Sequence, residues 1–127
     1  MISYRDGHNV DLDQLGELLL TGGWERRDRA RLAQEVAGSR YVVSAWDGSG
    51  LVGFARAISD GVRNGYISTV VVRPDYRGKG IGAALISRLL AGKEGIAFVL
   101  HARPEVKPFY ERSGFSNAPD MMRRPRR

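Results

Sequence analysis

The sequence contains no cysteine, which excludes disulfide bonds, thiolate nucleophiles and cysteine-ligated zinc or iron–sulfur centres. It contains only two histidines, and a closed metal site needs about four ligands, so we expect no metal. The apolar runs are a few residues long, far below the roughly 20 residues of a membrane-spanning helix. The first residues also lack the apolar core of a signal peptide, and we therefore expect a cytoplasmic protein without a membrane partner.

The length and composition indicate one globular domain. A chain of 127 residues supports a single core that buries roughly two-thirds of the surface exposed on unfolding. Hydrophobic residues make up 43% and charged residues 27%, close to the globular average, so the chain is not of the disordered class. We assign residues 1–122 to this domain and residues 123–127 to a basic C-terminal tail.

The net charge of +6 comes largely from that tail. Its four arginines are Arg123, Arg124, Arg126 and Arg127. A tail of this kind is typical of an arm that binds nucleic acid. It has no aromatic residue on which a base could stack, however, and the remainder of the chain is only mildly basic. We therefore favour a solvated tail and expect no nucleic-acid partner, with a nucleic-acid-binding protein as the alternative.

The spacing of apolar residues predicts a mixed sheet with helices on both sides, in the α/β class. Strands are expected at Ile2–Arg5, Tyr41–Trp46, Leu51–Ile58, Gly65–Val72, Ile96–Leu100 and Phe115–Arg123. Helices are expected after Asp11, after Asp28, after a glycine-rich loop at Asp75–Gly80, and at Val106–Ser113. The predicted order is β-α-α-β-β-β-α-β-α-β, and the fourth and fifth strands should be joined by a parallel crossover.

The glycine-rich loop carries the first functional signal. It reads Arg77-Gly78-Lys79-Gly80-Ile81-Gly82 and lies directly between an expected strand and an expected helix. Glycine permits positive φ, so several N–H groups can point into one concavity, and the helix adds its positive N-terminal end. These features predict a cradle for a diphosphate. The glycine spacing differs from the dinucleotide fingerprint and from the P-loop, while a purely structural turn stays open as an alternative.

Two segments resemble the GCN5-related N-acetyltransferase (GNAT) family. The stretch from Val70 to Leu85 is similar to the family's acyl-CoA signature Gln/Arg-x-x-Gly-x-Gly/Ala, which Arg77, Gly80 and Gly82 match. The segment Pro-Phe-Tyr-Glu-Arg-Ser-Gly-Phe at 108–115 is similar to the family's C-terminal FYE-(K/R)-x-GF element. The resemblance implies a GNAT-like acyl-CoA N-acyltransferase fold.

The resemblance also implies an activity. The family transfers an acetyl group from acetyl-CoA to a primary amine of a small molecule, peptide or protein, by direct attack in a ternary complex and without a covalent intermediate. Backbone amides of the loop, here Arg77–Gly82, would hold the pyrophosphate, and backbone groups of Val70, Val71 and Val72 would pair with the pantetheine arm. The strand at Ile96–Ala102 would part from Gly65–Val72 to admit the thioester. A homodimer is compatible with the resemblance.

Tyr110 and His101 are the candidate catalytic residues. Tyr110 matches the family tyrosine that protonates the leaving thiolate, and a phenol with a pKa of about 10 is a suitable donor at neutral pH. A core aromatic is the alternative for Tyr110. The strand before the loop contains no acid that could serve as the base. His101 is the candidate, because imidazole exchanges protons near neutral pH, and a packed or surface histidine is the alternative.

Four further residues are candidates for binding the acceptor amine. Trp24 could form a wall of the pocket, and Asp60 could attract a cationic amine. Tyr66 and Ser68 project from one face of their strand by alternation and could line the pocket. A non-catalytic acyl-CoA sensor with the same fold is the alternative interpretation of the whole chain.

Overall fold

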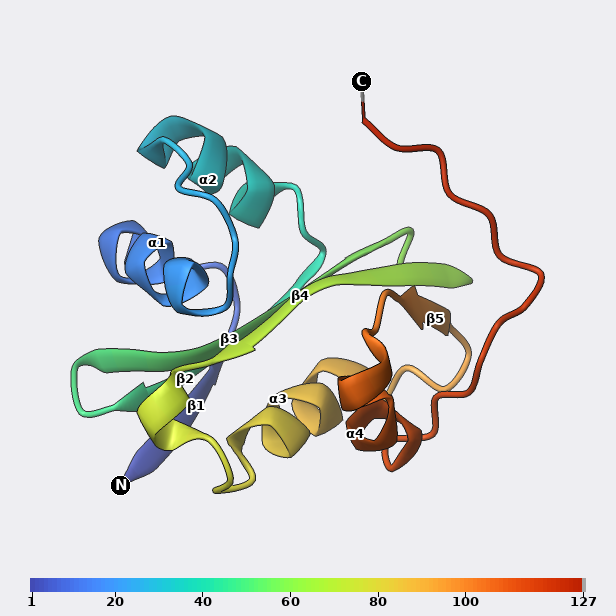
Figure 1. The fold of residues 1–127 in the computed structure, drawn as a ribbon. Helices are drawn as coiled ribbons and strands as arrows, with labels where there is room; N and C mark the ends of the chain where they lie inside the picture. The colour runs from blue at the N-terminus through green and yellow to red at the C-terminus, as the bar shows by residue number, and fades with distance from the viewer. Residues whose placement is uncertain (127) are drawn as a thin grey trace.

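The computed structural model describes residues 1–126 and contains a five-stranded sheet with helices on both faces (Figure 1). The strands are β1 (Ile2–Asp6), β2 (Tyr41–Asp47), β3 (Gly50–Ser59), β4 (Asn64–Val72) and β5 (Ala97–Leu100). The helices are α1 (Leu12–Thr21), α2 (Arg29–Ala37), α3 (Ile81–Leu90) and α4 (Lys107–Glu111), with short 3-10 turns at Pro74–Tyr76 and Pro104–Val106. Arg127, the last residue of the predicted basic tail, lies outside the described residues.

The sheet has the order β1-β2-β3-β4-β5. Neighbouring strands from β1 to β4 are antiparallel, and β4 and β5 are parallel. This arrangement confirms the predicted crossover, because α3 connects two parallel neighbours. In the part of the chain that the structure describes, no helix has the length and apolar character needed to cross a membrane.

The first two helices begin at aspartates, as predicted. The Asp11 carboxylate accepts hydrogen bonds from the N–H groups of Asp13 and Gln14, and Asp28 caps α2 in the same way through Arg31. These bonds satisfy donors that a helix N-terminus leaves free. The Gln14 side chain reaches the β2–β3 hairpin, where it accepts from the Leu51 N–H at 2.7 Å, so the start of α1 is tied to the sheet.

The two faces of the sheet carry separate halves of the core. Helices α1 and α2 cover one face, where their buried leucines meet aromatic side chains of β2 and β3. The residues central to this half are Leu15, Leu19, Leu32, Trp46 and Phe54. Helix α3 covers the other face with Ile81, Leu85, Ile86 and Leu89, against small residues of β2 and β3. Helix α4 packs on this second side, through Phe109 and Tyr110.

Strand β4 carries a bulge at the point where it loses its β5 neighbour. Arg56 of β3 is paired with Thr69, but the next residue, Ala57, is paired with Ile67, so Ser68 is the extra residue. Pairing with β5 begins at Asn64 and ends where Ile67 meets Leu100. Within residues 1–126, β4 therefore has no strand neighbour on its β5 side from Ser68 onward, and the expected parting of the two strands is confirmed.

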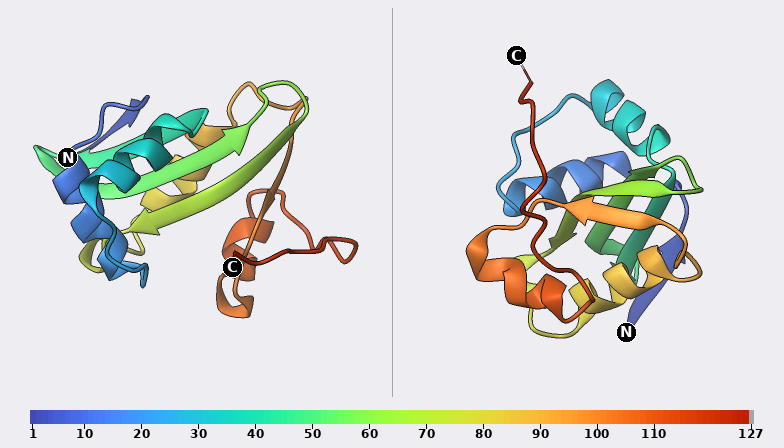
Figure 2. Two further views of the ribbon diagram at one scale, coloured as in Figure 1. Left: turned by 90° about the horizontal axis from the view of Figure 1, so that it is seen from above. Right: turned by 90° about the vertical axis from the view of Figure 1, so that its right-hand side faces the viewer.

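The predicted last strand at Phe115–Arg123 is wrong. No strand follows α4 in the described chain, and the order ends β-α instead of β-α-β. The segment contains Asn117, Pro119 and Asp120, residue types that are depleted in strands. The Met121 N–H donates to the Ala118 carbonyl, which closes a turn where a strand would run straight. The C-terminal segment instead passes β5 without pairing to it (Figure 2).

We expect Leu85→Ala to lower the free energy of unfolding by about 2–5 kcal/mol, because Leu85 is fully buried between α3 and the sheet. Denaturant unfolding followed by circular dichroism measures the change. Ser87→Ala is the matched control, since Ser87 is exposed on the same helix, and its effect should stay within about 0.5 kcal/mol. Equal losses in both variants would contradict the assignment of the core.

Candidate functional site

A cleft of about 1130 Å³ opens where β4 and β5 part. One wall is β4 from Ile67 to Val72, and the opposite wall is formed by the end of β5 and by α4. The loop between α1 and α2, through Gly22, Gly23 and Trp24, bounds it on one side of the sheet. The glycine-rich loop and the first turn of α3 bound it on the other. The cleft therefore joins the two regions that the sequence marks as functional.

The open edge of β4 presents backbone groups to this cleft. The Arg73 N–H donates to the Val52 carbonyl of β3 at 2.8 Å. Because backbone groups alternate in direction along a strand, those of Val72 and Val70 face the open edge, and those of Val71 face β3. The Val72 carbonyl accordingly accepts from Nε of Arg77 at 3.1 Å, outside the sheet. Two of the three valines predicted to offer backbone groups thus do so.

The glycine-rich loop presents a run of free N–H groups. Gly78 and Gly80 have φ of 76° and 81°, which favours glycine. The first hydrogen bond of α3 runs from the Ala84 N–H to the Gly80 carbonyl. None of the six N–H groups from Gly78 to Ala83 donates to another group within residues 1–126. Free N–H groups at the start of a helix form an anion-binding site.

The side chains around this loop are basic. The charged side chains that line the cleft are Arg77, Arg103 and Arg112, and no aspartate or glutamate among residues 1–126 lines it. Lys79 is exposed and is not among the residues that line the cleft. Its Nζ lies 5.2 Å from the centre of the Tyr76 ring. The cleft as a whole is suited to an anionic ligand.

Gly82 is required for a close contact between this loop and α4. A Cβ at Gly82 would lie 3.1 Å from the ring of Phe109. The aromatic ring of α4 therefore rests directly on the backbone of the first turn of α3. This contact fixes the distance between the loop and the neighbouring residue Tyr110.

Tyr110 lines the cleft and packs within an aromatic group. Its ring makes edge contacts with Phe109, at 4.9 Å between centroids, and with Phe115, at 5.9 Å. Burial raises the pKa of the Tyr110 phenol, so the hydroxyl keeps its proton at neutral pH. Tyr110 is thus a packed aromatic side chain that also forms part of the cleft wall.

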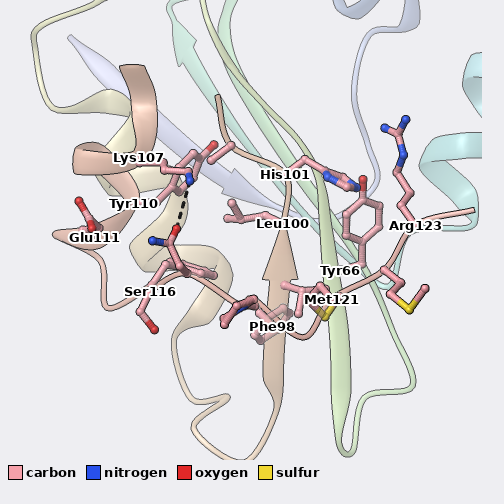
Figure 3. A pocket seen from close by; sticks show the side chains of 17 residues that line it. Tyr66, Phe98, Leu100, His101, Lys107, Tyr110, Glu111, Ser116, Met121 and Arg123 are labelled. Carbon is pink, nitrogen blue, oxygen red and sulfur yellow. Dashed lines mark hydrogen bonds between the residues drawn. The ribbon is translucent and has the colours of Figure 1, made fainter. Parts of the chain in front are cut away.

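His101 lines the cleft at the end opposite the loop, and Tyr66 lies beside it but does not line the cleft. Their rings are perpendicular with centroids 5.8 Å apart, and Figure 3 shows both beside Leu100. Both residues line a neighbouring hollow of about 680 Å³ between β5 and the C-terminal segment. His101 is exposed and Tyr66 is half-buried. His101 is therefore a solvent-accessible side chain of the cleft and not part of the core.

Trp24 and Ser68 both line the cleft, and Asp60 does not. Trp24 is half-buried against the α1 and α2 half of the core, and Ser68 lies at the β4 bulge. Asp60 stands in the β3–β4 turn, outside the cleft, where its carboxylate accepts from three backbone N–H groups. These bonds, that of Arg63 first, lower the pKa of Asp60. Its role is to close a turn.

The sequence did not point to Arg103 or to Thr69 as residues of the cleft. Arg103 lies three residues after the end of β5, and an arginine close to the end of a strand next to a predicted anion site is a usable signal. Thr69 has no such signal, because its place depends on the bulge at Ser68. Among residues 1–126 there is no group of three or more histidine, cysteine, aspartate or glutamate side chains that could hold a metal ion.

Known proteins share both the sequence and the arrangement of this chain. A family model of the GNAT acetyltransferase domain matches residues 23–124. Serotonin N-acetyltransferase 2, chloroplastic, of Oryza sativa subsp. japonica is 37% identical over 126 residues, which cover 94% of this chain and 63% of that protein. The chain thus spans less than two thirds of the length of this relative.

Solved structures show the same fold. A probable acetyltransferase from Staphylococcus aureus matches with a TM-score of 0.88 over 100% of this chain and 99% of its own, at 19% identity. A predicted acetyltransferase from Clostridium acetobutylicum, solved with acetyl-CoA, matches with a TM-score of 0.72 over 98% and 96% of the two chains, at 20% identity. At these identities the likeness shows the fold alone.

The mixed sheet opens between β4 and β5, beside a loop whose free N–H groups suit an anion. Together with the match to the family model, this arrangement defines an acetyltransferase domain. The chain belongs to the GNAT acetyltransferase family, as the match over residues 23–124 shows. The resemblance found in the sequence is therefore confirmed.

Proposed function

We propose that this protein transfers the acetyl group of acetyl-CoA to a primary amine. The observation that carries the proposal is the continuity of two backbone surfaces, the open edge of β4 and the six free N–H groups from Gly78 to Ala83. A long ligand with a diphosphate at one end and amides along its length matches such a surface. Family membership and the neighbour solved with acetyl-CoA support the same ligand.

The residues present fit acetyl-CoA along the whole cleft. The N–H groups of the loop would bind the pyrophosphate, with the positive end of α3 behind them. The backbone groups of Val70 and Val72 would pair with the amides of the pantetheine arm. Arg103 and Arg112 are available for the remaining phosphate, because guanidinium groups bind phosphate oxygens in pairs. The thioester would then lie near the bulge at Ser68.

The reaction is a direct transfer in a ternary complex. The amine nitrogen attacks the thioester carbon, a C–N bond forms, and the C–S bond breaks with the electron pair on sulfur. Tyr110 gives its phenolic proton to that sulfur, and its raised pKa suits a donor that must be protonated before the reaction. The chain has no cysteine to form a thioester intermediate.

His101 accepts the proton that the attacking amine must lose. The cleft lining holds no carboxylate among residues 1–126, so His101 is its one side chain suited to this task near neutral pH. Its exposure allows the proton to pass on to solvent. Tyr66 orients the imidazole through the edge contact between the two rings.

The acceptor enters from the side of the sheet that carries α1 and α2. Trp24 lines the cleft and offers aromatic surface there, which suits the carbon skeleton of a small amine, and Tyr66 offers a second ring beside His101 in the neighbouring hollow. The rice relative is named for an aromatic amine, serotonin, which supports a small-molecule acceptor for this chain. Figure 3 shows the Tyr66 and His101 side chains that would meet such a molecule.

Gly80→Val should weaken CoA binding by about tenfold or more, because valine disfavours the positive φ that aims the loop N–H groups. Isothermal titration with CoA measures the affinity. Gly92→Val is the matched control. Gly92 also has a positive φ, of 73°, a Cβ added there would meet no other atom within 4 Å, and the residue does not line the cleft. It should bind CoA normally. Equal affinity in the two variants would show that the loop is not the anion site.

Tyr110→Phe should lower kcat by about 10²-fold or more and leave the affinity for CoA nearly unchanged, because only the proton donor is lost. Release of free CoA thiol over a panel of primary amines measures turnover. Tyr41→Phe serves as the control, since Tyr41 lies outside the cleft. Full activity of the Tyr110 variant would remove this residue from the reaction.

His101→Gln should lower kcat/KM by about 10²-fold, because glutamine cannot accept the amine proton. Steady-state rates of thiol release at one fixed pH measure the change. His8→Gln is the matched control, because His8, the other histidine, lies outside the cleft and bonds to the Ser39 carbonyl. It should leave kcat/KM unchanged, and a rate unaltered by His101→Gln would exclude His101 as the base.

A further inference from the structure

A buried cation stands directly behind the β4 bulge. Arg56 of β3 points to the face covered by α1 and α2, and its side chain is 12% exposed. It is the residue at which the register between β3 and β4 changes. Nothing in the proposed reaction uses this arginine, although a buried charge has a high desolvation cost unless it is well paired.

The guanidinium of Arg56 links α2 to the bulge. Toward α2, Nη1 donates to Oγ of Ser39 at 3.1 Å, and Nη2 lies 3.4 Å from Oε1 of Glu35. Toward β4, Nη2 donates to Oγ of Ser68 at 3.0 Å, and Nε donates to Oγ1 of Thr69 at 3.2 Å. One planar donor group thus fixes both residues of the bulge at once.

These bonds decide how the Ser68 hydroxyl can act. A serine hydroxyl has one proton to donate and two lone pairs, and Arg56 occupies a lone pair of Ser68. Among residues 1–126 no group accepts the Ser68 proton. A charged donor also makes the hydroxyl it contacts a stronger donor in turn, because hydrogen bonds in a chain polarise one another. Ser68 lines the cleft, so its proton is available to a bound molecule.

The charge around Ser68 favours an oxygen as its partner. Glu35 is shared between Arg56 and Arg27, whose Nε lies 3.3 Å from Oε2, so the cluster holds two arginines for one carboxylate. No aspartate or glutamate of the described chain lines the cleft. A carbonyl or carboxylate oxygen meets a donor and an attractive positive charge here, whereas a second ammonium group would be repelled by that charge and would find only the remaining lone pair of Ser68.

We propose that Arg56 is a positioning residue that commits the Ser68 hydroxyl to donate to an oxygen of the acceptor, so that the enzyme prefers amines with a carbonyl or carboxylate oxygen close to the nitrogen. The inference rests on the proposed acetyl transfer and deepens it, because it names the acceptor class. Trp24 holds the apolar part of such a molecule, and Ser68 binds its oxygen.

The test compares three acceptors that share the phenethylamine unit: phenethylamine itself, which lacks the oxygen, phenylalaninamide, which adds a carbonyl, and phenylalanine, which adds a carboxylate. The quantity measured is kcat/KM for each oxygen-bearing amine divided by that for phenethylamine. Comparing this ratio between wild type and a variant cancels the intrinsic reactivity of each amine. A larger fall of the ratio from wild type to Ser68→Ala for phenylalaninamide than for phenylalanine identifies the carbonyl as the oxygen, and the reverse identifies the carboxylate.

Ser68→Ala should lower the ratio about five- to tenfold, the effect of one hydrogen bond, while phenethylamine is still acetylated. Ser68→Thr restores the hydroxyl and should recover most of the ratio. Arg56→Lys keeps a charge without the planar donor group, and it should lower the ratio as well. Ser39→Ala is the control, because it removes a bond to the same guanidinium on the side away from the cleft. It should leave the ratio unchanged.

The outcomes separate this inference from the proposed function. If wild type acetylates amines but Ser68→Ala slows all three equally, the hydroxyl acts on the thioester or the fold, and the inference is overturned. A ratio that falls equally in Ser39→Ala would show that the cluster is only structural, which also overturns it. If wild type releases no thiol with any amine, acetyl transfer itself fails, and the inference fails with it.

Discussion

The end of pairing between β4 and β5 is the constraint on which the rest of the molecule depends. Four residues of β4 pair with β5, and the bulge at Ser68 follows at once. A strand edge without a neighbour is normally an aggregation risk. Here the edge lies inside the fold, walled by β5 and α4 on one side and by the α1–α2 loop on the other. The protein thus keeps unpaired backbone groups where an extended ligand can pair with them.

The local features of the site could be predicted from the sequence, and the features that depend on register could not. Alternating glycines before a helical segment have a local signature, so the loop and the order of the elements up to α4 were predicted. The bulge depends on Arg56, a residue of another strand, and no local pattern reveals it. Position in a turn or loop also does not fix where a side chain points, as Asp60 and Lys79 show. The expected strand at Phe115–Arg123 does not form, and the segment contains Asn117, Pro119 and Asp120, which strands disfavour.

The positive potential at the two ends of the cleft has different sources. At the loop, neutral N–H groups and a helix end provide positive potential without mobile side chains. At the bulge, the positive potential comes from a whole charge, Arg56, which is paired with Glu35 and bonded to three hydroxyls. Burial lowers the pKa of Arg56 and Glu35 opposes that shift, and an arginine stays charged under both influences. Under the proposed function, backbone groups would bind the long ligand and side chains would select the smaller one.

The contact between Gly82 and Phe109 connects segments that are far apart in the chain. Even a methyl group at position 82 would require the Phe109 ring to give by a few tenths of an ångström. A larger side chain there would need a smaller ring at position 109 or an outward shift of α4 together with Tyr110, so changes at the two positions are coupled. Among related sequences, substitutions at positions 82 and 109 should therefore be correlated, because residues in contact tend to vary together.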